Sequence, residues 1–202
     1  MRQIILSILL SACAGALFAQ QKIQPIAIGT ALPMANAKMK STDGKEYSIK
    51  DKMGKNGVLV MFSCNTCPYV VRYQDRTLKT LQHARDNGFG VIILNSNEDM
   101  RNDEDSFEAM MAYAKNQGYE NTPYVVDQKS SVANAFGATR TPELFLFNKA
   151  GSLIYHGAID DNHIAAEAKR PHAKIAFEEA AKGKDVSVKE TRSVGCTIKR
   201  KI

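Results

Sequence analysis

A pair of cysteines follows directly on a continuous apolar run, and this junction restricts the possible folds more than any other stretch of the chain. Residues 58–62 read Val-Leu-Val-Met-Phe, which is typical of a strand buried on both faces of a sheet. Cys64 and Cys67 come next, and residues 69–87 then carry apolar side chains at helical spacing, with Gly88 as a helix-ending residue. The sequence therefore predicts a buried strand that leads through both cysteines into a helix.

The alternation of strand and helix continues downstream. Further strands are expected at residues 91–94, 124–127, 144–147 and 153–156, and two short ones on either side of the turn at residues 41–45. Further helices are expected at residues 103–117 and 131–136, and a last one begins at Asp161 or Asn162 and runs to about residue 182. Because strands alternate with helices and a hairpin comes late, the predicted fold class is α/β, with a central mixed β-sheet flanked by helices.

Composition and charge fit one globular domain over residues 20–202. Of the 202 residues, 44% are hydrophobic and 24% are charged, which differs from the composition of disordered and membrane-embedded chains. The formal net charge is +6, and part of it lies in a basic C-terminal tail over about residues 183–202. No basic stretch is interleaved with aromatic residues, so nucleic acid is not expected as a partner.

Residues 1–19 are typical of a signal peptide. Arg2 supplies a short positive segment, residues 4–18 are apolar or small, and Ala19 is a suitable cleavage site. An alternative is a lipoprotein signal, in which Leu-Ser-Ala before Cys13 leads to lipidation of that cysteine. The mature protein is therefore expected to be exported, periplasmic or extracellular, with membrane contact only if Cys13 is lipidated. Such compartments are typically oxidising.

The position of the two cysteines predicts thiol chemistry without a cofactor. Cys64 is expected at a helix N-terminus, where free N–H groups and the positive end of the helix dipole stabilise a thiolate. A lowered pKa would make Cys64 the nucleophile. Cys67 is then placed to attack a mixed disulfide on Cys64 and release the reduced product.

Two alternatives give these cysteines no catalytic role. A closed zinc site needs four ligands, and neither Cys196 nor the four histidines show a second paired spacing, so no metal is expected. An inert structural disulfide is the other alternative, although the strand-then-helix setting argues against it.

Two downstream features complete the candidate site. Thr141 and Pro142 stand at the start of a predicted strand, where a cis peptide bond would place the Thr141 backbone beside the cysteines for pairing with an extended substrate. Cys196 is the third cysteine that remains after signal cleavage. The sequence leaves open whether it pairs with Cys64, with Cys67 or with another chain, or stays a free thiol.

These motifs together resemble the thioredoxin superfamily. The matching stretches are residues 62–70, 141–147 and 157–162. More narrowly, the chain resembles the peroxiredoxin-like redoxins of the alkyl hydroperoxide reductase and thiol-specific antioxidant group that carry a Cys-x-x-Cys motif. The resemblance implies a thioredoxin-like fold, dithiol–disulfide exchange with Cys64 as nucleophile and Cys67 as resolving cysteine, and cis geometry at Pro142.

The sequence departs from the family pattern at two places. Val58 stands where thioredoxins usually carry a buried Asp that accepts the proton of the second cysteine, and Glu143 is a candidate replacement. Met61 stands where peroxiredoxins place a Thr or Ser that holds the peroxide. The second departure argues against efficient peroxidase activity.

We therefore expect an exported thiol–disulfide oxidoreductase. Its partners would be a disulfide-containing protein substrate and an unidentified thiol electron donor. The alternatives are a thiol peroxidase and, from a different class, a redox-inactive module that binds peptides or metal.

Overall fold

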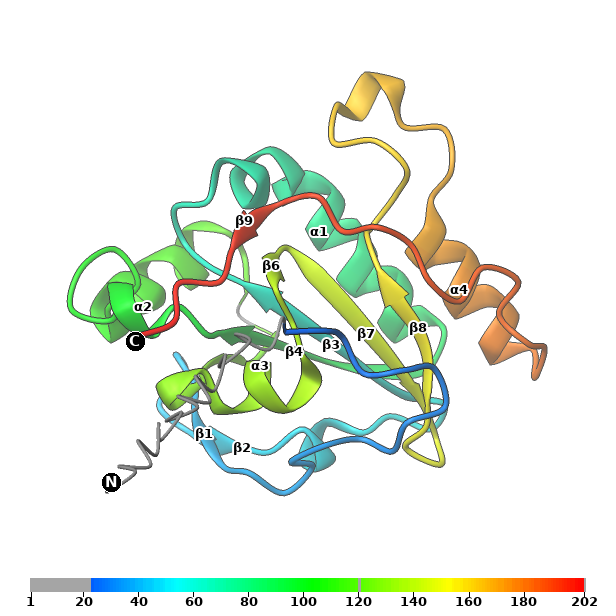
Figure 1. Cartoon of the computed structure of the whole chain (residues 1–202), viewed down its shortest axis with the longest axis horizontal. Coiled ribbons are helices and arrows are strands. Elements are labelled where there is room, and N and C mark those ends of the chain that lie inside the picture. The colour runs from blue at the N-terminus through cyan, green and yellow to red at the C-terminus, as the bar shows by residue number, and fades with distance from the viewer. Residues whose placement is uncertain (1–22, 120, 202) are drawn as a thin grey trace, which may run out of the picture.

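Five strands in the order β5-β4-β3-β7-β8 form the central sheet of the computed structural model, which describes residues 23–119 and 121–201 (Figure 1). Strands β3, β4 and β5 run parallel, whereas β7 and β8 add antiparallel neighbours, so the sheet is mixed as predicted. The bounds are Gly57–Ser63 (β3), Phe89–Asn95 (β4), Tyr124–Val126 (β5), Glu143–Asn148 (β7) and Leu153–Gly157 (β8).

Helices cover both faces of this sheet, and two pairs of short strands lie outside it. The α-helices are α1 (Pro68–Asp86), α2 (Phe107–Asn116), α3 (Ser131–Phe136) and α4 (His172–Ala181). The single-turn helices are η1 (Lys50–Lys52), η2 (Glu98–Met100), η3 (Gln128–Ser130) and η4 (Ala165–Glu167). The short strands are β1 (Met39–Lys40) with β2 (Glu46–Tyr47), and β6 (Arg140–Thr141) with β9 (Cys196–Thr197).

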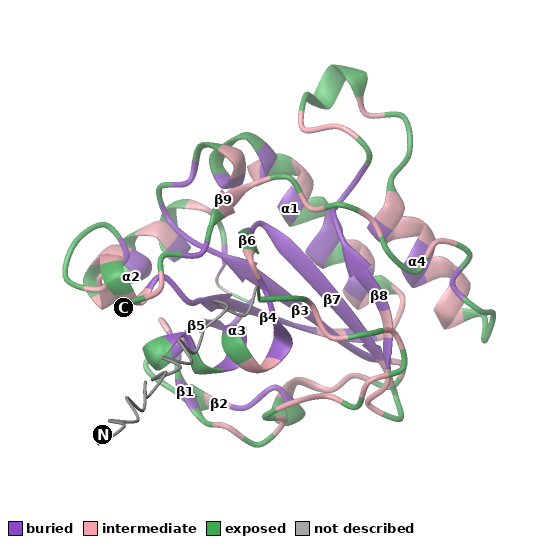
Figure 2. Cartoon of the chain, viewed as in Figure 1, coloured by how far each residue is buried: buried purple, intermediate pink, exposed green. Residues whose placement is uncertain are grey.

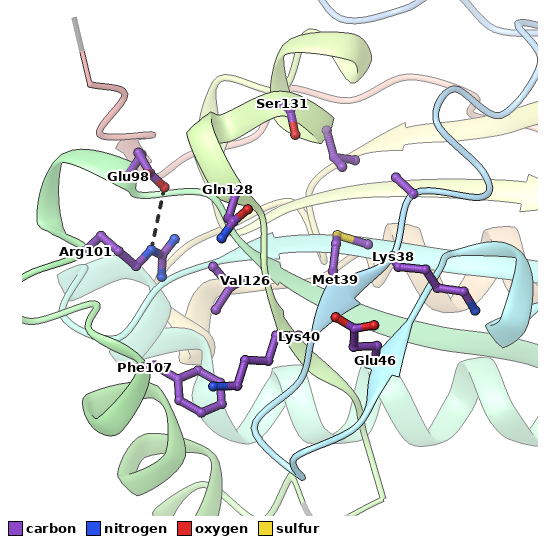
Figure 3. Close-up of a pocket in the computed structure, with 12 residues that line it drawn as sticks. Lys38, Met39, Lys40, Glu46, Glu98, Arg101, Phe107, Val126, Gln128 and Ser131 are labelled. Atoms are coloured by element: carbon purple, nitrogen blue, oxygen red, sulfur yellow. Dashed lines mark ion pairs between the residues drawn. The ribbon is translucent and has the colours of Figure 1, made fainter.

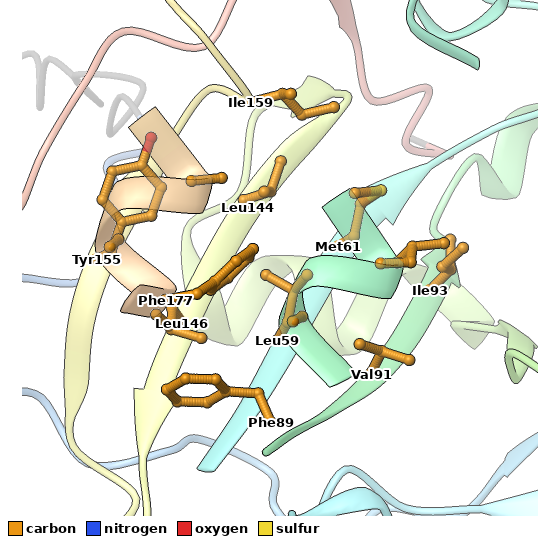
Figure 4. Packing of buried hydrophobic residues seen from close by; sticks show 14 of the residues in the cluster. Leu59, Met61, Phe89, Val91, Ile93, Leu144, Leu146, Tyr155, Ile159 and Phe177 are labelled. Atoms are coloured by element: carbon orange, nitrogen blue, oxygen red, sulfur yellow. The ribbon is translucent and has the colours of Figure 1, made fainter. Parts of the chain in front are cut away.

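The continuous apolar run of β3 contributes side chains to two separate cores, because successive side chains of a strand point to opposite faces of the sheet. Leu59 and Met61 face a cluster that includes Phe177 and other side chains of α1, α2 and α4 (Figure 4). Val60 packs in the opposite cluster with Phe136 of α3. Burying one such side chain stabilises the fold by about 1.5–3 kcal/mol. Figure 2 accordingly shows the sheet strands buried, with exposed residues on the outer sides of the helices.

Strand register brings several segments to one end of the sheet. Ser63 at the end of β3 pairs with Asn95 at the end of the parallel strand β4. Phe62 pairs with Glu143 at the start of the antiparallel strand β7. The loops that leave β3 and β4 and the segment that enters β7 therefore meet at this end.

Two helix boundaries differ from the predicted ones. Helix α2 begins at Phe107 rather than at residue 103, because Ser106 is its N-cap and accepts the Ala109 N–H at 3.3 Å. The last helix begins at His172, after Pro171. The carboxylate of Asp161 does not cap it and instead accepts backbone N–H groups within the preceding loop.

The C-terminal segment folds back over the domain. Figure 1 shows it running from α4 to β9, which lies beside β6. Val186 and Ile198 are buried, although much of the segment is exposed. The segment thus carries residues of the basic tail into contact with the sheet end described above.

The signal peptide predicted at residues 1–19 and Cys13 lie outside the described residues. Over the ranges that the structure does describe, no helix combines the length and the apolar character needed to cross a membrane.

Candidate active site

Cys64 and Cys67 lie in the turn between β3 and α1, as the sequence predicts. Cys67 is the N-cap of α1, and Pro68 occupies the first position of the helix. This is a favourable place for proline, because the first N–H groups of a helix have no partner within it. Both cysteine side chains are buried, with 1% and 4% of their surface exposed, so the pair lies beneath the surface.

Thr141 contacts both sulfur atoms. The Cys64 Sγ lies 3.3 Å from the Thr141 hydroxyl oxygen, and the Cys67 Sγ lies 3.4 Å from the Thr141 carbonyl oxygen. The Thr141–Pro142 peptide bond is cis, which confirms the prediction. The structure therefore brings together the two cysteines and the threonine-proline pair that the sequence singles out.

Cys196 is bonded to one of the two cysteines. A disulfide links Cys67 to Cys196, with 6.0 Å between their Cα atoms, and Cys64 is a free, buried thiol. Strand β9 holds Cys196 in place by antiparallel pairing with β6, in which Thr141 is opposite Cys196 and Arg140 is opposite Thr197. The pairing left open by the sequence is thus with Cys67.

The expected low pKa of Cys64 is wrong for this state of the protein. Burial raises the pKa of the Cys64 thiol above its ordinary value, and the negative charge of Asp105 adds to that shift. The Thr141 hydroxyl and the backbone N–H groups of Thr66 and Cys67 act in the opposite direction without overcoming burial. A helix N-terminus alone therefore does not make this thiol acidic while it is enclosed.

A buried polar network holds the turn between the cysteines, and sequence reasoning missed it. Asp105 is fully buried and accepts hydrogen bonds from the Asn65 backbone at 2.9 Å and from the Asn95 and Asn97 side chains at 2.6 and 2.8 Å. Tyr124 donates to the Asn65 side chain at 2.8 Å. The available signal was the polar Asn-Ser-Asn stretch immediately after a buried strand, because polar side chains there meet at the sheet end.

Glu143 has partners other than Cys67. One carboxylate oxygen accepts the backbone N–H groups of Thr139 and Arg140 at 2.7 and 2.9 Å. The other lies 2.8 Å from the His156 Nε2. The buried carboxylate therefore fastens β6 to the sheet.

The two departures from the family pattern lie in the cores. Val58 packs in the cluster on the α3 side, and Met61 packs in the cluster on the opposite face. Both side chains are fully buried among apolar residues. Neither position offers a polar group to the cysteines.

A comparison with protein-family models matches residues 27–171 to Redoxin, which is most of the chain. The chain belongs to the Redoxin family. A search of curated proteins gave no match.

Solved structures similar to this Redoxin-family chain cover between 65% and 88% of its length. A hypothetical protein of Sinorhizobium meliloti 1021 is 32% identical with a TM-score of 0.75, and the match covers 88% of this chain and 97% of that one. An uncharacterized conserved protein of Geobacillus kaustophilus is 28% identical with a TM-score of 0.79, covering 87% and 93%. The thioredoxin domain of a thiol-disulfide oxidoreductase from Bacteroides vulgatus is 21% identical with a TM-score of 0.53, covering 65% and 88%, which supports the thioredoxin-like fold.

This Redoxin-family chain also has a cavity away from the cysteines. It has a volume of about 380 Å³ and lies between β1, β2, η2, the start of α2 and η3 (Figure 3). Within it Arg101 pairs with Glu98 at 3.7 Å, and Lys40 lies over the ring of Phe107. None of the predicted site residues lines this cavity.

No group of three or more His, Cys, Asp or Glu side chains suited to a metal ion occurs within residues 23–119 and 121–201. The zinc alternative required Cys64, Cys67 and two further ligands. In this structure the Cys67 sulfur is bonded to Cys196 instead.

Proposed function

We propose that this protein is an exported thiol–disulfide oxidoreductase that uses the Cys64–Cys67 couple on disulfides of other proteins. One observation carries the proposal: Cys196, held on an extended strand, is paired with Thr141 and disulfide-bonded to Cys67. A cysteine of a partner protein, presented on an extended segment, would meet the same backbone edge and the same sulfur atoms.

The reaction begins with both cysteines reduced. The Cys64 thiolate attacks one sulfur of the partner disulfide, forming a mixed disulfide, and the other partner sulfur leaves as a thiolate that takes up a proton. The Cys67 thiolate then attacks the Cys64 sulfur and releases the second partner sulfur. The partner gains two electrons and two protons, Cys64 and Cys67 become a disulfide, and a thiol donor reduces them again.

Thr141 and Pro142 position the partner in this proposal. The Thr141 backbone pairs with the extended segment, and its hydroxyl, 3.3 Å from the Cys64 sulfur, donates a hydrogen bond to the thiolate. Pro142 has no N–H group and therefore ends the pairing edge. Glu143 holds this edge through its bonds to Thr139 and Arg140 rather than removing a proton from Cys67.

Reduced protein offered either a disulfide-containing protein or hydrogen peroxide tests the proposal. Cys64→Ser should abolish reduction of the protein disulfide, and Cys67→Ser should accumulate a mixed disulfide through Cys64. Rapid peroxide turnover that survives Cys67→Ser would instead favour the thiol peroxidase. An unchanged reduction rate in Cys64→Ser would contradict a catalytic role for Cys64. A wild-type protein that reduces no protein disulfide would favour the redox-inactive binding module, as would stoichiometric zinc in the purified protein.

Export rests on the signal peptide at residues 1–19, followed by a single domain over residues 20–202. The mass of the N-terminal peptide of the mature protein tests whether the signal peptide is cleaved. Cleavage after Ala19 leaves a free protein, whereas a lipid on Cys13 identifies a lipoprotein. An intact Met1 would contradict both routes.

A further inference from the structure

The edge of β6 that the proposed function assigns to a partner protein is occupied by the chain itself. Strand β9 lies antiparallel to β6 and places Cys196 opposite Thr141. The next backbone bond continues this contact, since the Ile198 N–H donates to the Thr139 carbonyl at 3.1 Å. A second extended segment has no room on this edge while β9 is docked.

Contacts on both sides of Cys196 dock the C-terminal segment. Before it, the Thr191 N–H donates to the His156 carbonyl of β8 at 3.0 Å. After it, the Lys199 N–H donates to the Asn97 side chain at 2.9 Å. Arg200 adds bonds from its guanidinium to the Asn134 side chain and the Ala138 carbonyl.

Few of these contacts bury apolar surface. Thr197 and Lys199 are exposed, and Ile198 is the apolar residue after Cys196 that becomes buried. Segments with exposed hydrogen bonds and little apolar burial open at low free-energy cost. The docking is thus suited to a segment that is placed accurately and released readily.

Gly195 allows the C-terminal segment to lie directly against the backbone of Thr141 and Pro142. A Cβ atom at residue 195 would lie 2.1 Å from the Thr141 carbonyl oxygen, 2.7 Å from the Thr141 carbonyl carbon and 3.3 Å from the Pro142 nitrogen. Backbone atoms cannot yield as a flexible side chain does, so only glycine fits here without displacement. The segment is therefore matched in shape to the threonine-proline pair.

The docked state encloses the proposed nucleophile. Cys64 is 1% exposed, and its sulfur shares the buried cluster of Cys67 and Val70, against which Cys196 packs. A partner protein cannot reach the Cys64 sulfur in this arrangement. The site must open before the reaction proposed above takes place.

We propose that Cys196 is a third redox-active cysteine, carried on a displaceable strand that closes the site as a Cys67–Cys196 disulfide and opens it by exchange with Cys64. This proposal rests on the function proposed above. In the exchange, the Cys64 thiolate attacks the Cys67 sulfur, a Cys64–Cys67 bond forms and the Cys67–Cys196 bond breaks. Cys196 leaves as a thiolate and takes up the proton that Cys64 released, so one thiol and one disulfide are present before and after. No external oxidant or reductant is consumed.

Disulfide mapping of the purified mature protein, from which residues 1–19 and therefore Cys13 have been removed, tests the exchange. The protein is reduced, reoxidised with glutathione disulfide to one disulfide per chain, quenched in acid, alkylated and digested without reduction. We expect Cys67–Cys196 to predominate in the wild type. In Gly195→Ala the ratio of Cys64–Cys67 to Cys67–Cys196 should rise about tenfold or more, which corresponds to about 1.4 kcal/mol of lost docking.

Two further variants separate docking from general damage. Val194→Ala changes the exposed neighbour of Gly195 and should leave the ratio unchanged. Arg200→Ala removes docking bonds at a distance from the sulfur atoms and should shift the ratio in the same direction as Gly195→Ala. This second variant also serves if Gly195→Ala fails to fold.

The proposal is overturned if folded Gly195→Ala and Arg200→Ala both keep the wild-type ratio, or if the wild type contains no Cys67–Cys196 disulfide. It is likewise overturned if Val194→Ala shifts the ratio as far as Gly195→Ala does. The mapping uses no protein substrate, so its failure differs from failure of the proposed function, which would be seen as protein-disulfide reduction that persists in Cys64→Ser.

Discussion

The carboxylate of Asp105 accepts the backbone N–H of Asn65 at 2.9 Å, which ties the turn between the two cysteines to the segment before α2. The same carboxylate accepts hydrogen bonds from the side chains of Asn95 and Asn97. These two residues lie where the chain leaves the end of β4, beside this turn. One buried acid thereby fixes the loops that follow two neighbouring parallel strands. Its charge also acts on the nearby Cys64 thiol.

Asp105→Asn should lower the pKa of Cys64. Burial is the main cause of the raised pKa, and the negative charge of Asp105 adds to it by disfavouring a second negative charge. Without that charge the thiolate forms at lower pH, so alkylation of Cys64 by iodoacetamide in native protein should reach half its maximal rate at lower pH. Asp103→Asn, at an exposed acid two residues away, is the matched control. A midpoint that is equal in the two variants would contradict this prediction.

Thr141→Val should have the opposite effect on the same measurement. The Thr141 hydroxyl lies 3.3 Å from the Cys64 sulfur and lowers its pKa, and valine keeps the shape of the side chain without the hydroxyl. The pH midpoint of Cys64 alkylation should therefore rise. Thr139→Val removes a nearby hydroxyl that does not contact the sulfur and should leave the midpoint in place. A fall of the midpoint in Thr141→Val would show that the hydroxyl does not stabilise the thiolate.

Glu143→Ala should lower the free energy of unfolding by about 1–3 kcal/mol, because it leaves partly buried hydrogen-bond donors without an acceptor. Those donors are the backbone N–H groups of Thr139 and Arg140, and His156 loses its partner as well. Glu143→Gln keeps one acceptor oxygen and should cost less. Urea unfolding measures the free energy of unfolding of both variants and of the wild type.

The Glu143→Gln variant also tests whether this carboxylate removes the proton of Cys67. Both of its oxygens have other partners, so we expect the lifetime of the mixed disulfide on Cys64 to be unchanged in this variant. A mixed disulfide that lives longer in Glu143→Gln than in the wild type would instead show that Glu143 acts as the base.

Arg76→Ala should destabilise the fold by about 3–5 kcal/mol, since it leaves the buried carboxylate of Asp160 without its counter-charge. The guanidinium lies 2.6 Å from that carboxylate and also donates to the backbone carbonyls of Asn162 and His163. Arg76→Lys restores the charge but not the planar set of donors, so an intermediate loss is expected. Arg72→Ala, at an exposed arginine of the same helix, should change the unfolding midpoint in urea very little. Equal losses at both positions would contradict the assignment.

Much of the fold was predictable because it depends on local pattern. The apolar run at residues 58–62 became β3, and the helix predicted at residues 131–136 became α3. The hairpin predicted from residues 144–156 is β7 and β8. Periodicity and glycine or proline at the ends of elements were sufficient in these cases.

The two helix boundaries that differed depend on which hydrogen bonds are made by the polar side chains at the predicted helix starts. Asp103 and Asp105 fit the first turn of a helix by charge, yet Ser106 caps α2 and Asp105 turns into the interior. Asp161 fits an N-cap by type, but its carboxylate accepts N–H groups of Lys169 and Arg170 in a loop. Local preference does not reveal which of several suitable polar residues will be buried.

By itself, the sequence determined that Cys64 and Cys67 stand between a buried strand and a helix and that Thr141 and Pro142 open a later strand, because these features depend on residues close together in the chain. Only the tertiary structure decided that Cys196 bonds to Cys67, that its strand occupies the edge of Thr141, and that enclosure raises the pKa of Cys64. Pairing across 129 residues and exclusion of water both depend on which distant segments pack together, and the residue types of each segment alone do not encode that choice.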